Sequence, residues 1–125
     1  MRRLSLALVV VLGLAAPAFA GGPFCGTGGQ LNPIASSYQQ MTVSTTAVAL
    51  TSIPSQAYAA VIIVESNSIR ARDDGTNPTA SVGMPYGVSS LPQVFTICGR
   101  ASLDKTRLIR AGGSDAAVNV SYYQK

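Results

Sequence analysis

Two cysteines are the residues of this sequence with the most distinctive chemistry. Cys25 and Cys98 are its only thiols, and the 125 residues contain no histidine. One interpretation is a disulfide, which would close a loop over most of the chain and stabilise it by about 4–5 kcal/mol. The alternative is a catalytic thiol, which needs a neighbouring base that histidine usually supplies. The absence of histidine also excludes a Ser–His–Asp triad and a histidine metal site, so the composition favours the disulfide.

Four arginines could form a surface for an anionic partner. Arg70 and Arg72 are two residues apart in one expected strand and therefore share a face, while Arg107 and Arg110 lie on another strand. Side by side, these strands would present a basic face to a phosphate or an acidic glycan. The alternative is a solvated outer face whose arginines pair with nearby carboxylates. The acids available for such pairs are Glu65, Asp73, Asp74 and Asp104.

An oxygen-rich cluster, Asp73-Asp74-Gly75-Thr76-Asn77, follows the first arginine pair. An EF-hand loop needs a glutamate at its twelfth position, and counting from Asp73 that position is Met84, so the calcium motif fails. The cluster instead predicts a turn in which Asp and Asn side chains bind backbone groups and Gly75 adopts a positive φ. The candidate binding surface includes Asp73, Asp74, Asn77 and also Tyr123, while we expect no metal and no other cofactor.

The first twenty residues have the pattern of a secretory signal peptide. Arg2 and Arg3 precede an uncharged apolar run from Leu4 to Ala16, and Ala18-Phe19-Ala20 matches a small-x-small cleavage site. A helix of that length reaches about 20 Å, short of the ~30 Å hydrocarbon core, which disfavours the alternative of an uncleaved anchor. We expect cleavage after Ala20, export to the periplasm or the extracellular space, and no stable membrane span afterwards.

Removal of twenty residues from 125 leaves 105, which is the size of one domain. Nine Lys and Arg against five Asp and Glu give a formal net charge of +4, and loss of Arg2 and Arg3 lowers it to +2. A charge this small does not indicate nucleic-acid binding. A chain of this length can bury a core without depending on a metal.

The mature chain divides into a Gly- and Pro-rich arm over residues 21–40 and a β-domain over residues 41–125. Short apolar or alternating runs separated by turn residues predict seven strands in the β-domain. The runs are Met41–Thr51, Tyr58–Glu65, Ile69–Asp73, Thr79–Met84, Gln93–Cys98, Thr106–Arg110 and Ala116–Tyr123. They predict an all-β fold, either a single β-sandwich or a jelly-roll-like barrel of mostly antiparallel strands. We also expect hairpins at 65–69 and 110–116, a central position for the second run, and Tyr122 in the core.

Three segments have a familiar pattern: TVSTTAVALTSIP, AVIIVESNSIRARDDGTNPTASVGMP and LIRAGGSDAAVNVSYY. With them, the region from Met41 to Tyr123 resembles small β-domains of tailed-phage virion structural proteins. The resemblance implies a non-enzymatic module that decorates a capsid or joins a head or tail assembly, and it assigns no functional residues. The signal peptide and the cysteine pair depart from that pattern, because virion proteins assemble in the cytoplasm. They suggest a bacterial envelope protein or an exported prophage-derived protein.

We therefore expect an exported, non-enzymatic β-sandwich that acts in assembly or surface binding, through self-association or a protein partner. The alternative is a periplasmic or extracellular module that binds a glycan or a protein through the arginine-bearing strands or the loops 74–78 and 85–92. An enzyme is disfavoured, since no catalytic motif converges in this sequence.

Overall fold

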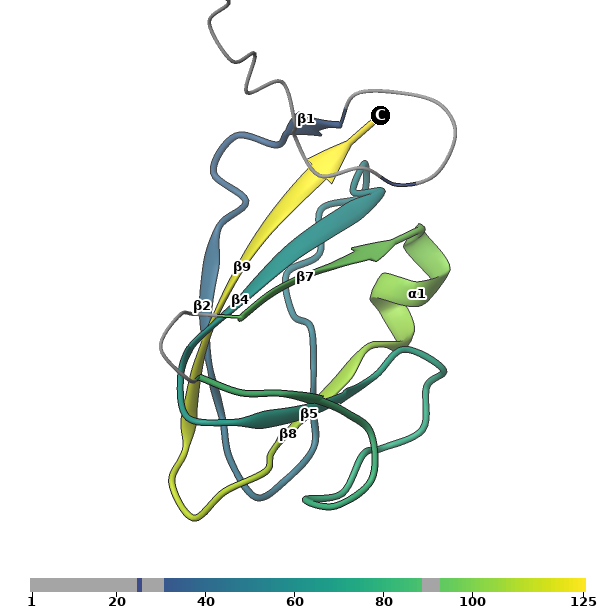
Figure 1. The fold of residues 1–125 in the computed structure, drawn as a ribbon. Coiled ribbons are helices and arrows are strands. Elements are labelled where there is room, and N and C mark those ends of the chain that lie inside the picture. The colour runs from purple at the N-terminus through teal and green to yellow at the C-terminus, as the bar shows by residue number, and fades with distance from the viewer. Residues whose placement is uncertain (1–24, 26–30, 89–92) are drawn as a thin grey trace, which may run out of the picture.

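The computed structural model describes Cys25, residues 31–88 and residues 93–125. The signal peptide expected over residues 1–20, its cleavage after Ala20 and part of the arm expected over 21–40 lie outside the described residues. The described chain forms nine strands and one six-residue helix (Figure 1). The all-β fold class is therefore confirmed.

The strands form two antiparallel sheets that face each other as a sandwich, and the described strands do not close into a barrel. Sheet A has the order β1-β9-β4-β7, with β2 following β1 along the same edge of β9. Its strands are β1 (Asn32–Pro33), β2 (Gln39–Val43), β4 (Ala59–Ser66), β7 (Gln93–Cys98) and β9 (Ala116–Gln124). Sheet B has the order β3-β8-β5-β6. Its strands are β3 (Val48–Ala49), β5 (Ile69–Arg72), β6 (Met84–Tyr86) and β8 (Arg107–Arg110).

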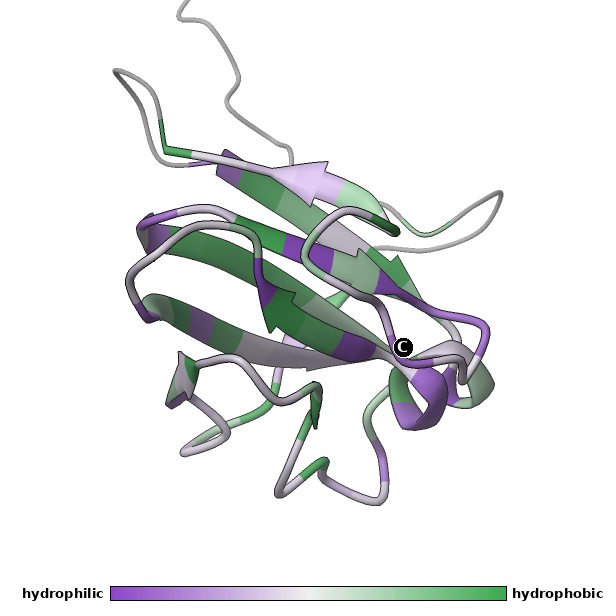
Figure 2. Ribbon diagram, turned by 90° about the horizontal axis from the view of Figure 1, so that it is seen from below, coloured by the Kyte–Doolittle hydropathy of each residue, from purple (hydrophilic) through white to green (hydrophobic). Residues whose placement is uncertain are grey.

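The core lies between the inner faces of the two sheets. Along β9 every second side chain from Ala116 to Tyr122 is buried, which is the alternation expected of a strand with one face on the core. Figure 2 shows apolar segments along the long strands of sheet A. The expectation that Tyr122 packs in the core is confirmed, because this side chain is 1% exposed. β4 is central as expected, since it pairs with β7 on one side and β9 on the other.

The hairpins expected at 65–69 and 110–116 are wrong, because β4 and β5 lie in different sheets and so do β8 and β9. Each of these two segments is instead a corner between the sheets. Asn67 in the first corner has a φ of 58° and donates from Nδ2 to the carbonyl of Asp115 in the second at 2.7 Å, so a hydrogen bond joins the two corners. Both corners carry the chain from one sheet to the other. Alternation alone cannot separate such a corner from a hairpin, because either one keeps the apolar side chains on a common core.

Two of the expected strands are also rearranged. The run from Met41 to Thr51 divides into β2 and β3, which belong to opposite sheets, so the chain crosses the sandwich within it. The strand expected over Thr79–Met84 is largely a turn, in which the backbones of Thr79 and Val82 bond to each other at 3.0 and 3.3 Å. The strand in this region, β6, begins only at Met84.

The helix α1 (Arg100–Lys105) was not expected from the sequence. It begins after Gly99, which has a φ of 90°, and it turns the fully buried Leu103 into the core. Thr106 follows the helix and donates from Oγ1 to the carbonyl of Ser102 at 2.8 Å. Six residues are too few to show a helical period in the sequence. Within the described residues, no helix is long and apolar enough to cross a membrane.

Candidate binding surface

The disulfide between Cys25 and Cys98 is confirmed, with the two Cα atoms 5.5 Å apart. Cys98 ends β7 and lies opposite Ala59 of β4, on the face of sheet A that points away from the core. Ala59 is nevertheless 0% exposed, so this corner of the outer face is covered. Because both sulfur atoms form the bond, neither acts as a nucleophile in this form of the protein.

The arginine-bearing strands β5 and β8 are paired neighbours in sheet B. Arg72 lies directly opposite Arg107, and Arg70 lies opposite Ile109. These pairs put Arg70, Arg72 and Arg107 on the outer face of sheet B, which we call the arginine surface. Alternation places Arg110 on the other face, beside the fully buried Ile69.

The charge of Arg72 is balanced by a carboxylate that lies just beyond the end of β5. Its guanidinium forms an ion pair with Asp74, whose Oδ1 also accepts the backbone N–H of Thr76 at 3.0 Å. These hydrogen bonds hold the pKa of Asp74 well below its usual range, and the bond from Arg72 has the largest effect. Gly75 has a φ of 88°, so the turn expected at 73–77 is confirmed. The carboxylate also offsets the repulsion between Arg72 and the arginine opposite it.

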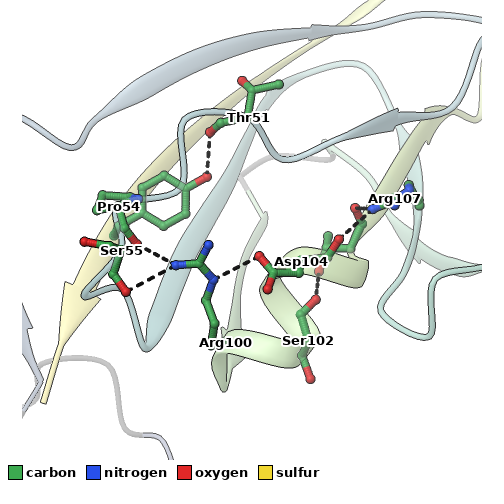
Figure 3. Close-up of polar contacts among 9 residues, drawn as sticks. Thr51, Pro54, Ser55, Arg100, Ser102, Asp104 and Arg107 are labelled. Carbon is green, nitrogen blue, oxygen red and sulfur yellow. Dashed lines mark hydrogen bonds and ion pairs between the residues drawn. The ribbon is translucent and has the colours of Figure 1, made fainter.

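The guanidinium group of Arg107 donates its hydrogen bonds to the end of α1, the helix that precedes β8 (Figure 3). Its Nη1 donates to the carbonyls of Asp104 and Thr106, each at 2.9 Å. These carbonyls belong to the C-terminal end of α1, where a positive charge stabilises the helix dipole. Arg107 therefore stabilises the end of the helix instead of reaching into solvent.

Arg100 is a structural residue that the sequence reasoning missed. Its Nη1 donates to the carbonyl of Pro54 at 2.9 Å, and its Nε donates to Asp104 Oδ1 at 2.9 Å (Figure 3). The side chain thereby ties α1 to the turn that precedes β4. The spacing of four residues between Arg100 and Asp104 is the signal that could have found this pair, since such residues are neighbours on a helix.

The other two arginines are also held by neighbours. Arg110 donates from Nη1 to Asp115 Oδ1 at 2.8 Å. Arg70 donates from Nη1 to the carbonyl of Gly83 at 3.0 Å, while its Nε is buried without a hydrogen-bond partner. Arg70 borders a shallow hollow of about 340 Å³, lined among others by Ser68 and Tyr86. Every arginine predicted to bind a ligand thus donates to a neighbouring group of the chain.

The remaining candidates do not form one surface with the arginines. Asp73 and Asn77 are exposed in the turn after β5, and Asn77 makes no side-chain hydrogen bond to the described residues. Burial, together with the charge of Asp73, raises the pKa of Tyr86. Tyr123 is half-buried on the outer face of sheet A, opposite Ala59, and so lies in the other sheet. The predicted binding surface is therefore split between the two sheets.

Four apolar residues on the edge strands β6 and β7 were missed by the sequence reasoning. The rings of Tyr86 and Phe95 stack with their centroids 3.8 Å apart, which joins the edge strands of the two sheets. Near this stack, Met84 is 40% exposed and Val94 is 59% exposed. We call these four residues the β6–β7 patch; Tyr86 and Phe95 are partly buried against the core, and Val94 lies on the outer face of sheet A. Alternation within QVFTIC could have indicated the exposure of Val94, because it places Val94 and Phe95 on opposite faces.

The described residues contain no cluster of three or more His, Cys, Asp or Glu side chains that could hold a metal ion. Two further hollows, of about 310 and 280 Å³, border the two strand ends that carry Arg110 and Arg72. These hollows and the one at Arg70 all border sheet B, away from Tyr123. No known protein family, curated protein or solved structure matches this chain.

Proposed function

We propose that this chain is an exported, non-enzymatic β-sandwich protein that acts by assembly, binding other protein surfaces and first of all copies of itself. Support comes from the β6–β7 patch. Aromatic side chains and Met are enriched at protein interfaces, and exposed apolar side chains that lie together can mark such an interface. The resemblance to phage structural domains points to the same class of function.

The alternative, a module that binds an acidic glycan, has weaker support. A polyanion would need guanidinium groups that are free to donate in pairs. Arg72 and Arg110 are bound to carboxylates, and Arg107 is bound to two helix carbonyls. Among the described arginines, only Arg70 has a buried Nε without a partner, and a buried atom offers little to a large ligand.

Export is supported by the disulfide and by the pattern of the first twenty residues. Disulfides form and persist in oxidising compartments and are rare in the cytosol. The proposed cleavage after Ala20 predicts a mature protein that begins with Gly21. Mass spectrometry of the protein from a bacterial periplasm would measure that N-terminus directly.

Light scattering over a concentration series tests assembly. We expect the oxidised protein to associate, and the variant Met84→Lys with Val94→Lys to remain monomeric, because two charges in an apolar contact must be desolvated. Tyr38→Lys is the matched control, since Tyr38 is 62% exposed but precedes β2, on the opposite edge of sheet A. A wild-type protein that stays monomeric up to millimolar concentration would refute the proposal.

A further inference from the structure

Asp74 is followed by Gly75, and this is the only place in the sequence where a glycine follows an Asp or an Asn. Both residues are exposed in the turn after β5. An aspartate before a glycine is prone to rearrange its own peptide bond, because no Cβ shields the nitrogen that follows it. The pair Asp74–Gly75 is therefore a candidate site of spontaneous modification.

The reaction converts aspartate to isoaspartate in two steps. In the first, the backbone nitrogen of Gly75 forms a bond to Cγ of protonated Asp74; the nitrogen loses its proton and the carboxyl group loses a hydroxyl, and the two leave as water. The product is a succinimide ring. In the second step, water adds at the main-chain carbonyl of Asp74, and the bond from that carbonyl to the nitrogen breaks. The chain then runs through the former side chain, and its mass is unchanged.

The turn holds the Asp74 carboxylate by both of its oxygen atoms. Arg72 donates from Nε to Oδ1 at 3.1 Å and from Nη2 to Oδ2, and the backbone N–H of Thr76 donates to Oδ1 at 3.0 Å. A guanidinium that binds two oxygens fixes the plane of a carboxylate as well as its position. Rotation of the carboxyl group toward the Gly75 nitrogen would break these bonds, so they oppose ring closure.

The same contacts keep the carboxyl group ionised. The hydrogen bond from Arg72 is the largest of the effects that lower the pKa of Asp74, and the bond from Thr76 is the second. A carboxylate cannot release a hydroxyl group, so ring closure needs the protonated form, which a lowered pKa makes rarer. Geometry and charge therefore act in the same direction.

We propose that Asp74–Gly75 is a latent isoaspartate site and that Arg72 is the residue that protects it. This role goes beyond the proposed assembly function and does not depend on it. While β5 is paired with β8, the backbone of Arg72 is fixed in the sheet and its side chain holds Asp74. When the ion pair opens or the chain unfolds, the site reacts.

Isomerisation would alter this corner of sheet B in a defined way. The additional main-chain carbon lengthens the turn, and the carboxylate moves away from the position that Arg72 and Thr76 bind. Arg72 would then face Arg107, which lies directly opposite, without the carboxylate that offsets their repulsion. Isoaspartate at residue 74 therefore marks molecules whose turn has been open.

Peptide mapping with electron-transfer dissociation measures the proposed modification, because the fragments distinguish isoaspartate from aspartate at equal mass. The folded, oxidised protein is incubated at physiological temperature and neutral pH beside a synthetic peptide of residues 69–80. We expect isoaspartate at residue 74 to form at least about tenfold more slowly in the protein, because the turn must open before the ring can close. A protein that isomerises as fast as the peptide would overturn the proposal.

Variants of Arg72 test the role of its side chain. Arg72→Ala should isomerise at least about threefold faster than the wild type, an effect in the range of exposed ion pairs. Arg72→Lys keeps the charge but not the two parallel donors, so its rate should lie between the two. Arg110→Ala is the matched control, because it removes the ion pair with Asp115 and should leave the rate at Asp74 unchanged.

Two results with the variants would contradict the protective role of Arg72. One is a folded Arg72→Ala protein that isomerises at the wild-type rate. The other is an equal acceleration in Arg110→Ala, which would assign the effect to a general loss of stability. Circular dichroism establishes that each variant is folded, and if Arg72→Ala is not, the rate of Arg72→Lys against the wild type decides.

Discussion

Reduction of the Cys25–Cys98 disulfide should remove a large share of the stability of this domain. The bond joins residues separated by 73 positions, and the chain-entropy relation for a loop of that size gives about 4 kcal/mol. Domains of this size have free energies of unfolding of about 5–15 kcal/mol, so the loss is a substantial fraction of the total. With a urea dependence of about 2 kcal/mol per molar, the unfolding midpoint should fall by about 2 M.

The assay is urea unfolding of the protein with and without reductant, followed by far-ultraviolet circular dichroism. The double variant Cys25→Ala with Cys98→Ala is the control, and it should match the reduced protein and not respond to reductant. The slope of the transition should also increase, because an unfolded chain without the cross-link exposes more surface. A midpoint shift below about 0.5 M, or an unchanged slope, would refute the reasoning that the bond acts on the unfolded chain.

Gly83→Ala should cost about 1–3 kcal/mol in thermal unfolding, because φ is 131° there and the added Cβ would lie 3.1 Å from the carbonyl oxygen of Ala71. Tyr122→Phe should cost about 1–2 kcal/mol, because its hydroxyl donates to the carbonyl of Thr51 at 3.2 Å. Burial raises the pKa of Tyr122 to about 12 from 10.0, so its contribution to the free energy of unfolding is complete below about pH 10 and is lost as the pH rises toward 12. Urea unfolding at alkaline pH should show this loss in the wild type and not in Tyr122→Phe. Leu103→Ala should cost about 2–5 kcal/mol, and an intact transition midpoint would contradict the role of α1 in the core.

The sequence predicted the fold class because most strands are marked by their own residues. The continuous apolar run of β4 predicts a strand buried on both faces, and the alternating run of β9 predicts a strand buried on one face. Both strands can therefore be recognised without tertiary information. The pairing of Cys25 with Cys98 followed from there being only two cysteines. The sheet to which each strand belongs was not predictable in the same way. It depends on the corners at 65–69 and 110–116, which are fixed by bonds between distant residues such as Asn67 and Asp115.

The candidate site was predicted less well, for a different reason. Spacing correctly put Arg70 and Arg72 on one face, but it could not show that Asp74 and the end of α1 would occupy the guanidinium groups. The β6–β7 patch was missed because exposure at a sheet edge depends on which strands lie next to each other. Val94 looks like any strand residue in the sequence, and only the strand order places it in an edge strand of the described sheet.

The order of the strands has a consequence for how the chain folds. Only one pair of consecutive described strands, β5 and β6, is hydrogen-bonded, and every other pairing joins segments that are distant in the sequence. β9, the last strand along the chain, pairs with β1, β2 and β4. Sheet A therefore cannot assemble until β9 has been synthesised, and such a topology folds in milliseconds to seconds. For the proposed export, this order means that sheet A stays incomplete for as long as β9 has not been made.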